Sequence, residues 1–289
     1  MMKITVIRNT LIFTIVIFNI FLGIAQAQSF KADDRELSIL YRLIYKDKVS
    51  FLFGTFHIRD IRFKKYETIL FEIVDSCDII LQESNSNLID AESSRILLSS
   101  DIKLSDRITV EDYQLIKDKI ESFWGEQQIE DFEYSSLYAI SNYIFSRSIV
   151  QTFKYTIEEY IGKYAQSLDK KFEYIEDADF QIQLLQGLPD SLFLDYLKNI
   201  EDRNDLYRKS LDYYFSGKLD SLELLPENDS LKEYLFKSRN ENFNQTVWEA
   251  LTTGNRIFIM VGYGHLQWEN GMLNFLRRKG VEVIRIILE

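Results

Sequence analysis

The chain has 289 residues, with 34 Lys and Arg against 45 Asp and Glu, so its formal net charge is −11 at neutral pH. A surface of this sign repels phosphate backbones, which argues against a nucleic-acid partner, and it attracts cations instead. Cys77 is the one cysteine, so the chain cannot form an internal disulfide. With two prolines and neither a Gly/Ser-rich linker nor an internal repeat, the chain is expected to form one domain.

Residues 1–27 have the pattern of a secretory signal peptide. A short basic start precedes an apolar run at 11–24, which is followed by a small-residue triplet ending in Ala27. The run is shorter than the roughly 18 to 20 apolar residues that span a bilayer, so a retained anchor is the weaker alternative. We expect cleavage after Ala27, which leaves a periplasmic or secreted domain at 28–289 with no stable membrane anchor. Cleavage removes two positive charges, so the net charge becomes −11 − 2 = −13.

The pattern that follows predicts two strands, a helix and a third strand. Two β-rich runs at 38–45 and 49–54 flank a short polar turn, which indicates a hairpin. Apolar residues at helical spacing follow at 66–74, and a short apolar strand at 78–82 then ends at Glu83. The domain is therefore predicted to begin in the order β, β, α, β.

The middle of the chain, at about 90–253, has apolar residues at helical spacing with charges between them, and we expect an all-helical insert there. Beyond Gly254 come a predicted strand at 256–261, a helix at 268–279 and a strand at 281–288. A helical crossover between these last two strands predicts a parallel pair. The two ends of the chain are expected to build one mixed β-sheet, which defines an α/β fold with a large helical insert.

Both histidines of the chain occupy the same motif. His57 and His265 each follow a predicted strand, and each has a glycine three positions before it, Gly54 and Gly262. With eleven glycines in 289 residues, one histidine has a chance of about 4% of such a neighbour, and two accidental matches have a chance of roughly one in several hundred. Glycine at a strand end permits a sharp turn, and the histidine then lies beyond the carboxyl edge of the sheet, where open α/β sheets bind ligands. We expect both imidazoles to face one cleft.

Glu83 occupies the equivalent place after a third predicted strand. Two imidazoles and a carboxylate are suitable ligands for a divalent transition metal. Such an ion brings the pKa of a bound water from about 15.7 toward about 7, which supplies a nucleophile without serine or cysteine. The carboxylate would ligate the ion, act as general base or orient the water. Taken singly, a histidine or glutamate after a strand is more often a core or solvated residue, so the hypothesis depends on all three together.

Other catalytic signatures are missing from the sequence. It has no Gly-x-Ser-x-Gly elbow, no His-Glu-x-x-His helix, no Cys-x-x-Cys pair and no Walker loop. Residues 262–264 match the first three positions of the Gly-x-Gly-x-x-Gly motif of dinucleotide-binding proteins, but Gln267 occupies the position of the third glycine. A nicotinamide cofactor is therefore not expected.

Five short motifs occur together along the chain. They are Gly-Thr-Phe-His at 54–57, Leu-Gln-Glu at 81–83, Glu-Asp-Ala-Asp-Phe-Gln at 176–181, Arg-Asn at 239–240 and Val-Gly-Tyr-Gly-His-Leu at 261–266. In this combination the chain resembles the TraB/GumN family, which includes the Tiki-type membrane metalloproteases. The similarity runs from about residue 37 to 288. It implies an α/β fold with a helical insert, and a metal-dependent peptidase activity that is demonstrated in some branches of the family.

The resemblance also implies roles for individual residues. A divalent ion such as Mn, Co or Zn would be held by His57, His265 and Glu83, with Glu176 as a further ligand. Glu83 would also take part in catalysis, and Arg239 would contact an oxyanion or a carboxylate. A salt-bridged or solvated helix face is the alternative for both Glu176 and Arg239.

Departures from the family pattern leave the substrate open. Asp177 replaces a threonine, and Asp179 and Phe180 replace a pair of acids. The predicted function is an exported metal-dependent hydrolase that acts on a peptide or another small-molecule substrate. The main alternative is a non-catalytic envelope protein that binds a peptide or a haem-like ligand, or that assists polysaccharide assembly.

Overall fold

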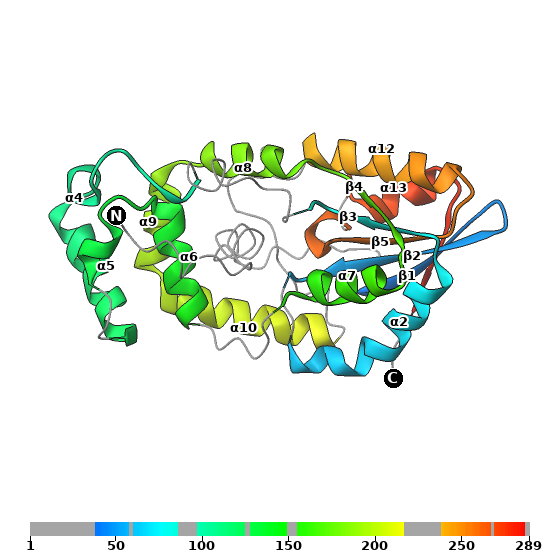
Figure 1. The fold of residues 1–289 in the computed structure, drawn as a ribbon, viewed down its shortest axis with the longest axis horizontal. Helices are drawn as coiled ribbons and strands as arrows, with labels where there is room; N and C mark the ends of the chain where they lie inside the picture. Colours follow the sequence, from blue (N-terminus) through cyan, green and yellow to red (C-terminus); the bar gives the residue numbers. More distant parts are fainter. Residues whose placement is uncertain are drawn as a thin grey trace.

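The structure is a computed structural model that describes residues 38–57, 60–85, 97–124, 128–148, 155–216, 238–266 and 269–286 (Figure 1). The predicted signal peptide lies outside the described residues. In chain order the elements are β1 (Leu40–Tyr45), β2 (Lys48–Thr55), η2 (Ile61–Tyr66), α2 (Glu67–Ser76), β3 (Ile79–Gln82), α4 (Leu104–Arg107), α5 (Val110–Trp124), η4 (Ile129–Phe132), α6 (Leu137–Ser148), α7 (Ile157–Ser167), β4 (Lys171–Tyr174), α8 (Ala178–Gln186), α9 (Asp190–Lys198), α10 (Ile200–Ser216), α12 (Ser238–Thr252), β5 (Ile257–Gly262), η7 (Tyr263–His265), α13 (Met272–Arg278) and β6 (Glu282–Arg285).

Within the described residues, six strands form one mixed sheet in the order β4-β3-β5-β2-β1-β6. The strands β4, β3, β5 and β2 are parallel, whereas β1 is antiparallel to both β2 and β6. All of β5 is buried, because its apolar residues are covered on both faces of the sheet. Since β2 and β3 flank β5 in parallel, the carboxyl ends of these three strands lie at one edge of the sheet.

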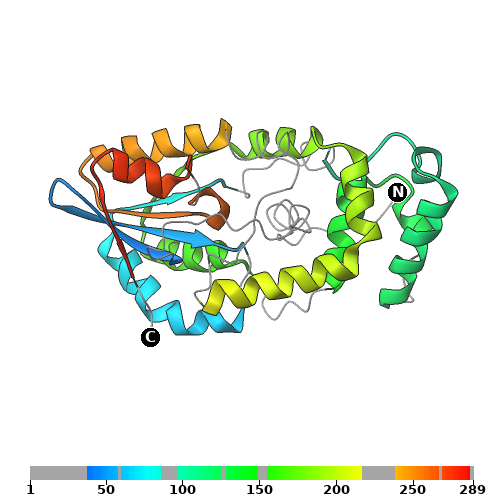
Figure 2. The ribbon, with the colours of Figure 1, turned by 180° about the vertical axis from the view of Figure 1, so that it is seen from behind.

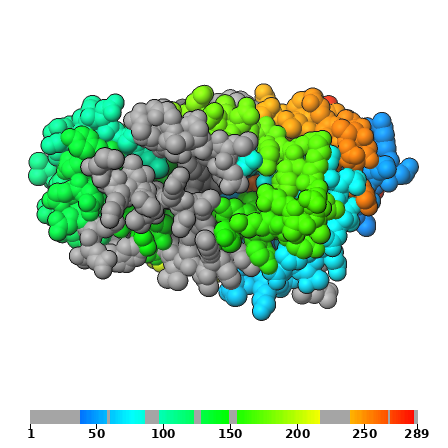
Figure 3. Space-filling model, in the orientation of Figure 1, coloured from blue at the N-terminus to red at the C-terminus, as the bar shows by residue number. Residues whose placement is uncertain are grey.

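The predicted hairpin at the start of the domain is confirmed. Lys46 and Asp47 form a two-residue turn between β1 and β2, and their φ angles are 47° and 64°. Positive φ at both positions is what a tight hairpin turn requires, because it matches the twist of the strands. The hairpin lies at the end of the molecule opposite α4 and α5 (Figures 1 and 3).

Helices cover both faces of the sheet. Opposite views show α12 and α13 over one face and α2 and α7 over the other (Figures 1 and 2). Helix α7 comes close to β3 at Gly162, where an added Cβ would lie 3.3 Å from the side-chain nitrogen of Gln82. The result is a three-layer α/β/α arrangement, which confirms the predicted α/β fold.

Helices from the middle of the chain form a lobe at the far end of the molecule. There α5, α6 and α9 pack together, and α8 and α10 run along the long axis between the lobe and the sheet (Figure 1). The helical insert is therefore present, but the expectation that it is all helical is wrong. Strand β4 lies within it and pairs with β3 at the edge of the sheet. No helix in the described segments is long and apolar enough to cross a membrane.

The last strand has a different neighbour from the predicted one. β6 pairs with β1, so two strands separate it from β5, and the expected parallel pair does not form. Both edges of β5 are already occupied by β2 and β3, and the returning chain pairs with the outer edge of β1 instead. The glycines Gly254 and Gly280 follow α12 and α13 as predicted, each with a φ of 81°.

Candidate functional site

The predicted residues His57, Glu83 and His265 follow three neighbouring parallel strands. His57 comes after β2, Glu83 after β3, and His265 lies in η7 directly after β5. Oε2 of Glu83 accepts a hydrogen bond from the backbone N–H of Gly262 at 3.1 Å, and the same oxygen lies 4.0 Å from Nε2 of His57. The carboxylate therefore lies between the two Gly-x-x-His turns.

The glycine of each turn makes room for the other turn. A Cβ atom on Gly54 would lie 2.3 Å from Cδ1 of Leu266 and 2.8 Å from Cδ2 of Tyr263. A Cβ atom on Gly262 would lie 2.6 Å from Nε2 of His57. Because real Cβ atoms do not approach other atoms so closely, the repeated glycine spacing has a steric reason, and the two turns pack directly against each other.

His57 is held in an unusual backbone conformation. Its φ is 54°, in the left-handed region that costs a non-glycine residue about 1–3 kcal/mol. Nδ1 donates a hydrogen bond to Oε1 of Glu158 at 2.6 Å, because a carboxylate can only accept, and Oγ1 of Thr55 lies 3.4 Å from the same nitrogen. Burial lowers the pKa of His57, but Glu158 and then Glu83 more than reverse this, so the pKa lies above its ordinary value.

His265 is held in a matching way by a neutral partner. Its Nδ1 lies 2.6 Å from Oδ1 of Asn240, an acceptor, so the proton is on Nδ1. The imidazole stacks on Phe243 with ring centroids 4.1 Å apart and 12° between the planes. Burial and the nearby Arg239 lower the pKa of His265 to about 3, so this imidazole is neutral at ordinary pH.

Arg239 joins Glu83 and Glu176 in a buried network. Its Nη2 donates to Oε1 of Glu83 at 2.8 Å and to Oε2 of Glu176 at 2.7 Å, and its Nε donates to Oε1 of Glu176 at 2.9 Å. Nε2 of Gln181 donates to Oε1 of Glu83 at 3.1 Å. Both oxygens of Glu176 are thus used by Arg239, whereas Glu83 is held through Oε1 and turns Oε2 toward His57.

The charges of this network keep Glu83 ionised. Burial raises the pKa of Glu83, but Arg239 and the two imidazoles outweigh burial, and the pKa falls to about 2. Burial raises the pKa of Glu176 above its ordinary value, because Arg239 compensates only part of the desolvation. Glu83 is therefore a carboxylate at any pH near neutrality.

Three residues that contact the site were not predicted from the sequence. Glu158 and Asn240 hold the histidines, and Gln181 holds Glu83. A capping box of Thr156 and Glu159 marks the start of α7 in the sequence and is present in the structure, but it does not reveal that Glu158 reaches a histidine. Asn240 and Gln181 lie inside motifs that carried the family resemblance, which was the available signal for them.

The donor chemistry of His57, His265 and Glu83 fits a divalent ion. In its neutral form each imidazole carries its proton on Nδ1, which leaves Nε2 as the ligating nitrogen, and Glu83 is ionised. In the part of the chain that the structure describes, no group of three or more His, Cys, Asp and Glu side chains is close enough to hold an ion as it stands. Tetrahedral ligands lie roughly 3.4 Å apart, so His57 and Glu83, at 4.0 Å, require only a small approach.

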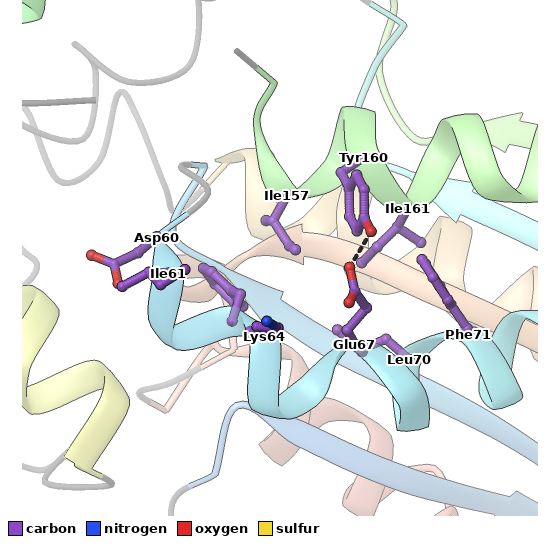
Figure 4. Close-up of a pocket in the computed structure, with 10 residues that line it drawn as sticks. Asp60, Ile61, Lys64, Glu67, Leu70, Phe71, Ile157, Tyr160 and Ile161 are labelled. Atoms are coloured by element: carbon purple, nitrogen blue, oxygen red, sulfur yellow. Dashed lines mark hydrogen bonds between the residues drawn. The ribbon is translucent and has the colours of Figure 1, made fainter. Parts of the chain in front are cut away.

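A cavity of about 210 Å³ lies between η2–α2 and α7 (Figure 4). Its walls belong to the segments that carry the site, because Asp60 is three residues after His57 and Ile157 directly precedes Glu158. The hydroxyl of Tyr160 donates to Glu67 between the two walls. Most of the lining is apolar, from Ile61, Phe63, Leu70, Phe71, Ile157 and Ile161.

The fold and this centre define an α/β protein with two histidines and a glutamate at the carboxyl edge of its sheet and a helical insert in its middle. The chain belongs to the TraB/PrgY/gumN family, whose model matches residues 39–285. The family resemblance predicted from the five motifs is thereby confirmed. No curated protein matches the chain, and neither does any solved structure.

Proposed function

We propose that the protein is an exported hydrolase that uses a divalent metal ion, held by His57, His265 and Glu83, to cleave peptides. The observation that carries this proposal is the orientation of the two imidazoles. Each is hydrogen-bonded through Nδ1 to an acceptor, which is the usual arrangement of metal-ligating histidines. Export is proposed from the apolar run at 11–24 and the small residues that follow it.

The balance of buried charge favours a cation at this place. Glu83, Glu158 and Glu176 carry up to three negative charges against one positive charge on Arg239. Without an ion, the raised pKa of His57 favours a proton on this imidazole, which brings the sum to −3 + 2 = −1. A divalent ion that displaced this proton would face a sum of −3 + 1 = −2, which it would balance.

The residues around the ion would have separate tasks. A divalent ion held by these residues would lower the pKa of a water and so supply a nucleophile for an amide bond at neutral pH. Glu83 would present Oε2 to the ion or to that water, while Arg239 and Gln181 hold its other oxygen. In this proposal Glu176 holds Arg239 in place, and its role as a further ligand stays a prediction.

The cavity between η2–α2 and α7 supports a peptide as the substrate. At about 210 Å³ it is smaller than the roughly 300–1,000 Å³ of sites that enclose a whole small ligand, so it suits one side chain of a longer molecule. Its lining from Phe63, Leu70 and Ile161 suits an apolar side chain. We therefore propose peptides with a large apolar residue close to the bond that is cleaved.

The metal content of the purified protein tests the first half of the proposal. We expect about one divalent ion per chain, and a loss of most of it in His57→Ala and in His265→Ala. The matched control is Asn255→Ala, a surface change outside the site. An unchanged metal content in both histidine variants would overturn the proposed metal site.

Digestion of a broad peptide library, with manganese, cobalt or zinc added, tests the second half. We expect cleavage that Glu83→Gln loses. Saturable peptide binding without any product, retained in Glu83→Gln, would instead support the alternative of a non-catalytic binding protein.

A further inference from the structure

We propose that Glu158 is a positioning residue that fixes the imidazole of His57 with Nε2 turned toward Glu83. The inference rests on the proposed metal site, and it assigns a role to a residue that no motif singled out. Glu158 does not follow a strand. It lies in the first turn of α7, which covers the face of the sheet beside β3.

The contact between the two side chains is short and buried. Nδ1 of His57 and Oε1 of Glu158 are 2.6 Å apart, within the range of charge-assisted hydrogen bonds. The side chains are 10% and 19% exposed, so water does not compete freely for either partner. In the neutral ring this bond places the proton on Nδ1, which leaves the lone pair on Nε2, the nitrogen that faces Glu83.

His57 needs such a partner because its backbone does not fix the ring by itself. With a φ of 54° the residue occupies a conformation that persists only when its surroundings hold it. Gly262 limits the ring on the opposite side, where an added Cβ would touch Nε2. The imidazole is thus confined between a glycine at one nitrogen and a carboxylate at the other.

Helix α7 is attached to the sheet in a way that fixes the carboxylate. Nε2 of Gln82 donates to the backbone oxygen of Glu158 at 3.4 Å, which joins this turn to the end of β3. The hydroxyl of Thr156 accepts from the backbone of Glu159, whose side chain accepts in return from the backbone of Thr156. The helix N-terminus also favours a negative charge at Glu158.

The negative charge of Glu158 is stabilised mainly by His57, with smaller contributions from the hydroxyl of Thr55 and from the residue's own backbone N–H. Oε2 of Glu158 is buried without a hydrogen-bond partner among the described residues. A glutamine would offer the same acceptor to Nδ1 without the desolvation of a charge, as Asn240 does for His265. The charge therefore acts on His57, because a carboxylate at Nδ1 makes Nε2 a stronger ligand for a cation.

Two variants at one position separate the charge from the hydrogen bond. Glu158→Gln keeps an acceptor and removes the charge, whereas Glu158→Ala removes both. The matched control is Glu159→Gln, which makes the same change of charge one residue away and keeps a side chain that can close the capping box. All four proteins are titrated with zinc ions alone, in competition with a metal indicator.

Nitrogen NMR of the histidine rings, recorded after chelation, gives a readout that does not need metal. The spectra are recorded at a pH above the raised pKa of His57, where its ring is neutral. We expect wild type, Glu158→Gln and Glu159→Gln to show His57 protonated at Nδ1 only, and Glu158→Ala to show a mixture of tautomers, with His265 unchanged as internal reference. We expect zinc affinity to fall about 10-fold in Glu158→Gln and about 100-fold in Glu158→Ala, and to stay within twofold in Glu159→Gln.

The outcomes separate this inference from the proposed function. A wild-type protein that binds no zinc contradicts the metal site, and the ring tautomers still decide the role of Glu158. A single His57 tautomer in Glu158→Ala, with unchanged zinc affinity where zinc binds, overturns the inference. If Glu158→Ala does not fold, a zinc affinity in Glu158→Gln equal to wild type overturns it as well.

Discussion

The α-carbon of Gly262 faces the imidazole of His57 so closely that a Cβ atom would lie 2.6 Å from Nε2. The two residues come from opposite ends of the chain and meet because β5 pairs with β2, where Gly262 is opposite Thr55. The contact leaves no space for any side chain at position 262. The position of His57 therefore depends on Gly262, the glycine that begins the turn of His265.

Gly262→Ala is expected to displace His57 and weaken divalent-metal binding at least tenfold, with the fold retained. The comparison is Gly254→Ala, where a φ of 81° strains the backbone but no atom lies within 4 Å of the added Cβ. That control should lose about 1 kcal/mol of stability and no metal affinity. Metal titration and thermal unfolding of both variants check the prediction. Equal metal affinity in the two proteins would contradict it.

Arg239→Met is expected to cost about 3–5 kcal/mol of unfolding free energy, because it leaves two buried carboxylates without their cation. Arg239 is 4% exposed, against 11% for Glu83 and 2% for Glu176. Arg256→Met is the control, since the side chains of Arg256 and Asp78 are about half exposed and solvent screens their ion pair, so its loss should change the unfolding free energy much less. Urea unfolding measures both. A loss at Arg239 no larger than the loss at Arg256 would refute a structural role for the network.

Stability is expected to fall as the pH drops below about 6.5, and His265 should account for part of the slope. Burial lowers the pKa of this imidazole from 6.5 to about 3. Between these values the unfolded chain takes up a proton there and the folded protein does not, so each pH unit costs about 1.4 kcal/mol. Glu83, with its pKa lowered to about 2, adds to the loss below about pH 4.5, where the unfolded carboxyl takes up a proton first.

Urea unfolding of the chelated protein from about pH 7 to about pH 4 measures this slope. In His265→Gln the change in unfolding free energy per pH unit should be smaller, by the contribution of about one proton. An identical slope in the two proteins would show that His265 is not buried in its neutral form.

Ile161→Phe is expected to narrow the cavity between η2–α2 and α7 and to lower cleavage next to large apolar residues about tenfold, with cleavage next to small residues less affected. The control is Leu168→Phe, because Leu168 lies at the end of the same helix and is 42% exposed. Metal content should be unchanged in both. The same product profile in both variants would exclude the cavity as a specificity site.

The sequence was sufficient for the central part of the fold. The strands β2, β3 and β5 are short apolar runs followed by His57, Glu83 and a turn that contains His265, and such runs can be recognised without a structure. Strand β4 could not be recognised, because Lys171–Tyr174 alternates charged and aromatic residues between helices and is stable only through pairing with β3. The neighbour of β6 likewise could not be predicted, because it depends on the order of all the other strands in the sheet.

For the candidate site, the sequence predicted the residues at strand ends but not the residues that hold them. A side chain that follows a strand has a position fixed by the sheet, so His57 and Glu83 could be placed together. Glu158 looks like any acidic residue in the first turn of a helix, and its contact with His57 results from how α7 packs on the sheet. Packing of this kind leaves no periodic pattern in the sequence.

The central position of β5 governs when the molecule can be completed. In total 256 of the 289 residues precede this strand, yet it is the one that joins β2 to β3. Contacts between such distant segments form slowly. Until β5 is in place, the edge of β2 and the edge of β3 that pair with it remain unpaired. A nascent polypeptide released before Ile257 would therefore lack both the middle of its sheet and His265. His265 directly follows the strand that completes the sheet, so no partly synthesised chain contains all residues of the candidate site.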